Sequence, residues 1–200
     1  MNKPEYVKVD DKLYKINTDF RIAIECNKIM GDKTISDIER AMATIYKLFG
    51  ENGLNCKNQN KLLELGIKYL LLGKEQNELK NNSKKNYELD INKCEGIIAS
   101  SFVFDYGYNP YNLKYLHWYD FYNDLENLST SEFGNCCILN RITSVLNTKV
   151  NEIKDNKIRN QTAESQRELK RRYCKEEKIE ITKEQEESAR QLYESLGIKI

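Results

Sequence analysis

Aromatic side chains are concentrated in one stretch of the sequence, between residues 106 and 128. This stretch, YGYNPYNLKYLHWYDFYNDLENL, holds the only Trp, the only His and six of the 13 Tyr of the chain. On a helix that starts near Asn112, the aromatic residues form one continuous face: Tyr111, Tyr115, Trp118, Tyr119 and Tyr122. Because Leu and Phe cover much of the rest of its surface, we expect this helix to be buried between neighbours.

The remaining sequence predicts further helices behind a short N-terminal β-hairpin. Residues 6–9 and 13–16 alternate with period two around Asp10-Asp11-Lys12, which is typical of a hairpin. Ser36 and Glu39 have capping-box spacing and predict a helix to about residue 49. Other helices are expected at about 18–30, 58–72, 90–104, 129–146, 153–178 and 182–196, with Asn17 or Thr18, Asp90, Ser129 and Thr182 as N-caps. The fold class is therefore mainly α, with about six to eight helices.

The composition changes near residue 150 and divides the chain into two parts. Residues 1–150 are expected to form the helical core domain with the hairpin, and residues 151–200 to form charged C-terminal helices. Ala189, Leu192, Tyr193 and Leu196 give the last helix a narrow apolar face. These helices either fold back on the core or present a surface to another chain, and the sequence leaves both open. The polar run at 73–86 is expected to be a linker, with a partner-docking loop as the less favoured alternative.

Charge and cysteine usage narrow the classes of function. The 32 basic and 31 acidic side chains leave a net charge of +1, so no field of the whole chain attracts nucleic acid or membranes. There is no apolar run long enough to span a bilayer and no signal peptide, so we expect a soluble cytosolic protein. The six scattered cysteines, with one His in the chain, predict buried thiols without a metal or other cofactor.

Residues that support catalysis are scarce, so we do not expect an enzyme. The nine Gly are dispersed and form no phosphate-binding loop. A Ser or Cys nucleophile needs a positioned base, and the only His, His117, lies between Leu116 and Trp118, where packing in the core is the better interpretation. Asp120 and Asp124 have the spacing of an acid pair or hard-metal site, but without further carboxylates we expect a solvated stripe.

The charged C-terminal part contains the candidate partner-binding residues. Its basic side chains alternate with glutamates at spacings that favour intrahelical ion pairs, so a solvated helix is preferred to a phosphate-binding one. Stacking of the aromatic face on bases is likewise less favoured than core packing. The candidates for contact with a partner are Arg167, Lys170, Arg171, Leu192 and Tyr193.

Several sequence pieces, in order and spacing, resemble one protein family. They are VDDKLYKINTDFR, a Gly-Lys-Glu after the third helix, YGYNPYNLKYLHWYDF, NRITSVLN and ELKRRY. Together they resemble the bacteriophage gene-product-fifteen family of the tail gene clusters of long-tailed phages and prophages of Gram-positive bacteria. The resemblance covers roughly residues 6–173, and INTDFR and LHWYDF are its most specific pieces. Its signature residues, expected in the core, are Leu116, His117, Trp118, Tyr119 and Phe121.

The resemblance implies a non-enzymatic tail-assembly chaperone. Such a protein would bind the helical tape-measure protein and tail-tube proteins in the host cytoplasm and be absent from the finished particle. Self-association stays open, membrane binding is not expected and nucleic acid is disfavoured. The alternatives are a structural virion protein of the tail or head-tail connector and, less favoured, a helical phage nucleic-acid-binding protein.

The chain departs from the family pattern at three places. Trp118-Tyr119 replaces two adjacent Trp, and Asp10-Asp11 replaces Asp-Gly in the hairpin turn. Both changes are mild, because Tyr can fill most of a Trp site and the turn can lengthen. The segment after Tyr173 is longer than usual, so the role of this extension does not follow from the resemblance.

Overall fold

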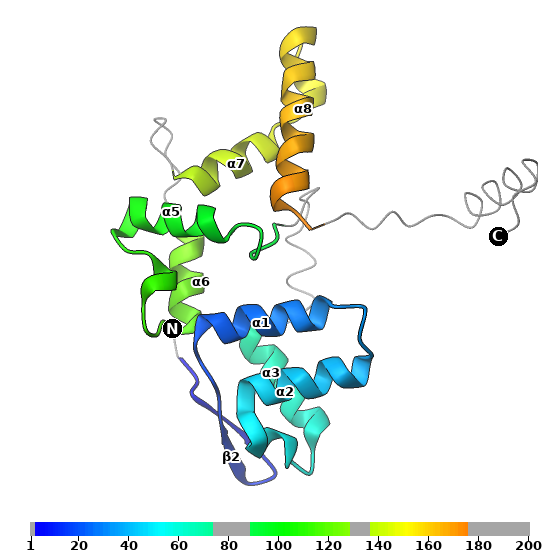
Figure 1. Ribbon diagram of the computed structural model, residues 1–200, viewed down its shortest axis with the longest axis vertical. Helices are drawn as coiled ribbons and strands as arrows, with labels where there is room; N and C mark the ends of the chain where they lie inside the picture. The colour runs from blue at the N-terminus through cyan, green and yellow to red at the C-terminus, as the bar shows by residue number, and fades with distance from the viewer. Residues whose placement is uncertain (1–2, 74–88, 129–136, 176–200) are drawn as a thin grey trace, which may run out of the picture.

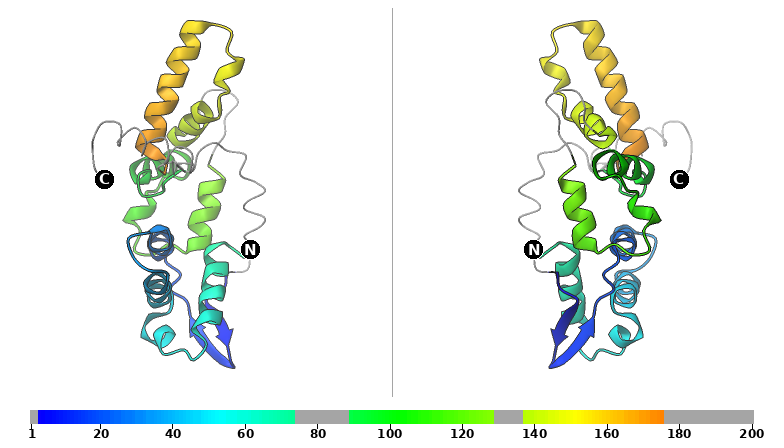
Figure 2. Two further views of the ribbon diagram at one scale, coloured as in Figure 1. Left: turned by 90° about the vertical axis from the view of Figure 1, so that its right-hand side faces the viewer. Right: turned by 90° about the vertical axis from the view of Figure 1, so that its left-hand side faces the viewer.

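The fold is mainly helical, as the sequence predicts. The computed structural model describes residues 3–73, 89–128 and 137–175, and within these ranges it contains seven α-helices and one two-stranded hairpin (Figure 1). The hairpin and helices α1 to α3 form one end of the molecule, and α5, α7 and α8 form the other. Helix α6 lies between the two ends in all views (Figure 2). None of the described helices combines the length and apolar character needed to cross a membrane.

The N-terminal hairpin pairs β1 (Tyr6–Val9) with β2 (Lys12–Lys15) in antiparallel register, which confirms the predicted hairpin. Asp10 and Asp11 have φ angles of 46° and 63°. Positive φ at both central residues is what a tight two-residue turn requires, and Asp tolerates it better than most residues. Val9 and Tyr14 are buried, and the strands pack on α2 and α3. This packing supports a ribbon that would be marginal alone.

Helices α1 (Phe20–Gly31), α2 (Asp37–Leu54) and α3 (Gln59–Leu70) pack behind the hairpin. The Ser36–Glu39 capping box is present, with hydrogen bonds of 3.2 and 2.8 Å. Helix α1 is capped by Asp19 and not by Asn17 or Thr18, because the Asp19 carboxylate accepts from the Arg21 backbone N–H at 2.9 Å. Helix α2 continues beyond the predicted end at residue 49 after a kink at Gly50, whose φ of 64° and ψ of −158° suit only glycine.

The aromatic stretch forms a shorter helix than predicted. Helix α6 (Trp118–Glu126) begins six residues after Asn112, and a 3-10 turn, η1 (Pro110–Asn112), precedes it. The prediction was wrong because the intervening backbone pairs with another segment: the Phe20 N–H donates to Leu116 O at 2.9 Å, and the Trp118 N–H donates to Thr18 O at 2.8 Å. Tyr115 consequently lies outside the helix and is 55% exposed.

Helix α5 (Glu95–Tyr106) also begins later than predicted. Its N-cap is Cys94, and Asp90 opens a turn in which its carboxylate accepts from the Asn92 N–H. The Asp90 backbone N–H donates to Tyr173 O at 2.9 Å, a contact with the distant end of α8 that no local pattern reveals. The expected Asp90 cap of the helix was therefore wrong.

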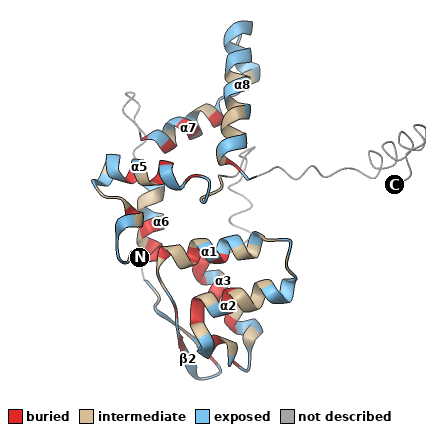
Figure 3. Ribbon diagram, in the orientation of Figure 1, coloured by how far each residue is buried: buried red, intermediate tan, exposed pale blue. Residues whose placement is uncertain are grey.

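Helices α7 (Ile138–Asn147) and α8 (Asn156–Tyr173) follow, with a 3-10 turn, η2 (Val150–Glu152), between them. Gln166 of α8 donates through its amide to the carbonyls of Val145 and Thr148 and so holds α8 against the end of α7. No residue of α8 is buried, in keeping with its charged sequence (Figure 3). The predicted Ser129 cap, the helix at 182–196 and most of the run at 73–86 lie outside the described residues.

Candidate functional site

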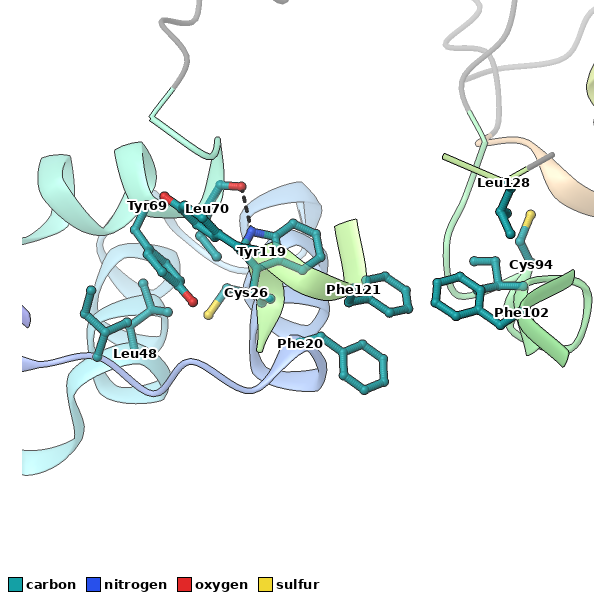
Figure 4. Close-up of a cluster of buried hydrophobic side chains, with 14 of the residues drawn as sticks. Phe20, Cys26, Leu48, Tyr69, Leu70, Cys94, Phe102, Tyr119, Phe121 and Leu128 are labelled. Carbon is teal, nitrogen blue, oxygen red and sulfur yellow. Dashed lines mark hydrogen bonds between the residues drawn. The ribbon is translucent and has the colours of Figure 1, made fainter. Parts of the chain in front are cut away.

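The aromatic cluster joins α1, α5 and α6 through stacked rings. Phe121 is at its centre, with ring centroids 4.4 Å from Phe20, 5.5 Å from Phe102 and 6.0 Å from Trp118, all at interplanar angles of 22° or less. Phe20, Phe102 and Phe121 are fully buried, and Trp118 is 2% exposed. Figure 4 shows the rings of Phe20, Phe102 and Phe121, which come from α1, α5 and α6, beside one another. The cluster therefore connects the two ends of the molecule.

The two most specific family pieces, INTDFR and LHWYDF, lie side by side in the fold. The Phe20–Leu116 and Trp118–Thr18 backbone bonds join them directly. Arg21 adds a second connection: it forms a salt bridge with Asp19 at 2.9 Å and donates to the carbonyls of Tyr111 and Leu113. The guanidinium uses one nitrogen for the carboxylate and the other for the carbonyls, an arrangement that the single nitrogen of a lysine cannot reproduce. Arg21 is thus a structural residue that sequence reasoning missed.

Trp118 is anchored by its indole as well as by its ring contacts. Its Nε1–H donates to Leu70 O at 3.1 Å, drawn as the dashed line in Figure 4. Leu70 is the last residue of α3, where backbone carbonyls have no partner inside the helix. The bond therefore satisfies a buried acceptor and fixes the start of α6 to the end of α3.

His117 acts as the N-cap of α6. Its Nδ1 accepts from the Tyr119 backbone N–H at 3.1 Å, so the neutral ring carries its proton on Nε2. The side chain is buried, and Nε2 has no hydrogen-bond partner within the described part of the chain. Burial lowers the pKa of His117. A buried neutral imidazole whose acceptor nitrogen is already occupied is suited to capping and packing and not to general base catalysis.

Tyr69 and Tyr119 pack beside His117. Their rings stack at 5.3 Å, and the imidazole meets both edge-on. Burial is the main cause that raises the pKa of each tyrosine, and Tyr69 lies well above its ordinary value. Both phenols and the imidazole are consequently neutral near neutral pH and pack as uncharged rings in the core.

Asp120 and Asp124 bind different partners and do not act as a pair. Lys3 Nζ lies 2.6 Å from Asp120 Oδ1. Tyr108 donates its hydroxyl to Asp124 Oδ2 at 2.6 Å, and Tyr106 donates to the Asp124 carbonyl at 2.8 Å. Across residues 3–73, 89–128 and 137–175, no three His, Cys, Asp or Glu side chains are grouped in a way that would hold a metal ion. These carboxylates thus support the fold around α6.

The candidate partner-binding residues are only partly described. Arg167, Lys170 and Arg171 lie on α8, and Leu192 and Tyr193 fall outside the described residues. Arg171 donates to both oxygens of Glu168 at 2.9 and 3.1 Å, and Arg172 shares the same carboxylate. These two guanidiniums lower the pKa of Glu168 to about 2. Part of the basic charge of α8 is therefore balanced within the helix.

Sequence reasoning missed an exposed surface on α5. Val103 is 50% exposed and Phe104 is 59% exposed, and Gly96 and Ser100 lie on the same side of the helix. None of these four residues, which form the outer face of α5, is charged. The signal was present in the sequence: small residues lie at i and i+4 of the helix, and apolar residues lie at i+7 and i+8. These positions share one face, and none of them is charged.

Comparison with known proteins gives one match. A family model described as Bacteriophage Gp15 protein matches residues 2–175. The match confirms the resemblance based on INTDFR and LHWYDF, and it ends at the last described residue, before the C-terminal extension. Searches among curated proteins and among solved structures found no match.

Proposed function

Because the chain belongs to the Bacteriophage Gp15 protein family, we propose that it is a phage tail-assembly chaperone. In this role it binds the tape-measure and tail-tube proteins in the host cytoplasm while the tail is built, and it performs no catalysis. The observation that carries the proposal is the family match, which spans the described fold and points to a phage structural or morphogenesis protein.

The surface of the protein supports binding of a helical partner. A long amphipathic protein aggregates unless its apolar side is covered, and a surface with apolar side chains and small residues allows close helix packing. The outer face of α5 has this character, with Val103 and Phe104 exposed beside Gly96 and Ser100. It is therefore the described surface that we assign to the partner.

Co-expression with the tape-measure protein of the same phage tests the proposal. The tape-measure protein should become soluble and co-purify with this chain. A tape-measure protein that precipitates unchanged would contradict the chaperone function.

Substitution of Phe104→Asp tests the assigned surface. A carboxylate in a desolvated contact opposes binding, so recovery of the tape-measure protein should fall about tenfold or more. Ile38→Asp on α2 is the matched control, because Ile38 is a 76% exposed apolar residue outside this surface. Recovery should be unchanged with the control. If recovery of the tape-measure protein is the same with Phe104→Asp and with the unaltered chain, this surface is not the binding site. The co-expression result then still tests the chaperone function.

A further inference from the structure

Among the described residues, the small end of the outer face of α5 has no close neighbour, and its hydroxyl is satisfied within the helix. Ser100 Oγ donates to Gly96 O at 2.8 Å within the helix, so its hydroxyl needs no outside acceptor. A Cβ placed on Gly96 would meet no atom within 4 Å. The face therefore offers a shallow site for apolar side chains beside the projecting Val103 and Phe104.

The described chain ends next to the start of this helix. Tyr173 O accepts from the Asp90 N–H at 2.9 Å, Cys174 forms an antiparallel bridge with Leu89, and Lys93 Nζ donates to Cys174 O at 3.1 Å. These contacts fix Lys175 beside the segment that leads into α5. The 25 residues that follow Lys175 start from this point.

The length of the C-terminal extension suits a return to α5. Residues 176–188 can span up to about 40 Å when extended. The distance along α5 from Gly96 to Phe104 is only about 12 Å at the helical rise per residue. A tether of this length gives the end of the chain a high effective concentration at the face, which a second copy of the protein lacks.

The extension also has the side chains that such a contact requires. Ala189, Leu192, Tyr193 and Leu196 follow the i, i+3, i+4, i+7 spacing of one helical face. Ala189 is small, and the other three residues of this face are large and apolar. The outer face of α5 has the same mixture, with Gly96 and Ser100 small and Val103 and Phe104 large. Close approach of two helices is favoured where small residues lie at the contact.

We propose that residues 189–196 dock on the outer face of α5 in the same molecule, with Leu192 and Tyr193 over Ser100 and Phe104. The extension then covers the exposed apolar face of its own core. The tape-measure protein, which is assigned to the same face, would displace this segment when it binds. The contact is tested on the isolated chain, so its failure would leave the chaperone function untouched.

Thiol labelling of the full chain tests the contact. Ser100→Cys places a thiol of similar size on the outer face of α5. The rate at which this thiol reacts with an aromatic disulfide reagent is measured, and the rate of the unaltered chain is subtracted from it. Adding Leu192→Asp and Tyr193→Asp should speed labelling about tenfold or more, because the aspartates disfavour burial of the extension. The gain should not depend on protein concentration.

Ser144→Cys is the matched control, since Ser144 is an exposed helical serine on α7. Its labelling rate should be the same with and without the two aspartates. If the two aspartates do not change the labelling rate of Ser100→Cys, the proposal is overturned. Protection that weakens on dilution would also overturn it, because a second copy would then cover the face.

Discussion

At the residue scale, the buried side chains of LHWYDF hold the fold together through specific contacts. Trp118 donates to the last carbonyl of α3, His117 caps α6, and Phe121 stacks between Phe20 and Phe102. The sequence predicted a buried aromatic group from its composition. It did not predict the Trp118–Leu70 bond or the stacking of Phe121 on Phe20, because these contacts join residues far apart along the chain.

Trp118→Phe should destabilise the fold by about 1–3 kcal/mol, because the buried Leu70 carbonyl loses its donor. The free energy of unfolding in denaturant measures the effect. Tyr46→Phe is the control, because Tyr46 is 51% exposed. This substitution should change the free energy of unfolding by no more than about 0.5 kcal/mol. Equal stability of the Trp118→Phe variant and the control would show that the indole hydrogen bond contributes little.

Stability should depend on pH through His117. Burial lowers its pKa in the folded chain, so the unfolded chain binds the proton more tightly than the folded one. The free energy of unfolding should therefore fall as pH drops below the ordinary value of about 6.5, by at most about 1.4 kcal/mol per pH unit. His117→Asn retains a capping side chain and should remove this slope between about pH 5 and 7. An identical slope in the variant would assign it to other groups.

At the element scale, local patterns predicted elements whose ends are set locally. The hairpin turn at Asp10-Asp11 and the Ser36 capping box depend on residues within a few positions of each other, and both were predicted correctly. The starts of α5 and α6 were placed too early because backbone pairing with Tyr173 and Thr18 takes the preceding segments out of the helix. Helical periodicity alone does not contain this information.

Gly50→Ala should destabilise the protein by about 1–3 kcal/mol, because the φ and ψ of Gly50 lie in a region that is essentially restricted to glycine. Gly31→Ala is the matched control. A Cβ at Gly31 meets no atom within 4 Å and its φ is negative, so this substitution should be neutral or slightly stabilising. Thermal unfolding of both variants measures the difference. A Gly50→Ala variant as stable as Gly31→Ala would show that α2 does not need the kink.

At the scale of the whole molecule, α6 connects the hairpin end to the end formed by α5, α7 and α8 (Figure 1). The family pieces INTDFR and LHWYDF meet at this connection through backbone hydrogen bonds and stacked rings. The surfaces assigned to binding lie elsewhere. The outer face of α5 was not predicted from the sequence, because only the arrangement of the neighbouring elements shows which side of this helix is left exposed.

The fate of the protein during tail assembly tests the chaperone function most directly. Quantitative mass spectrometry is applied to assembly intermediates from infected cells and to purified finished particles. A tail-assembly chaperone is expected to be bound to the tape-measure protein in the intermediates and absent from the particles. A fixed stoichiometric amount of the chain in finished particles would contradict it and identify a structural virion protein instead.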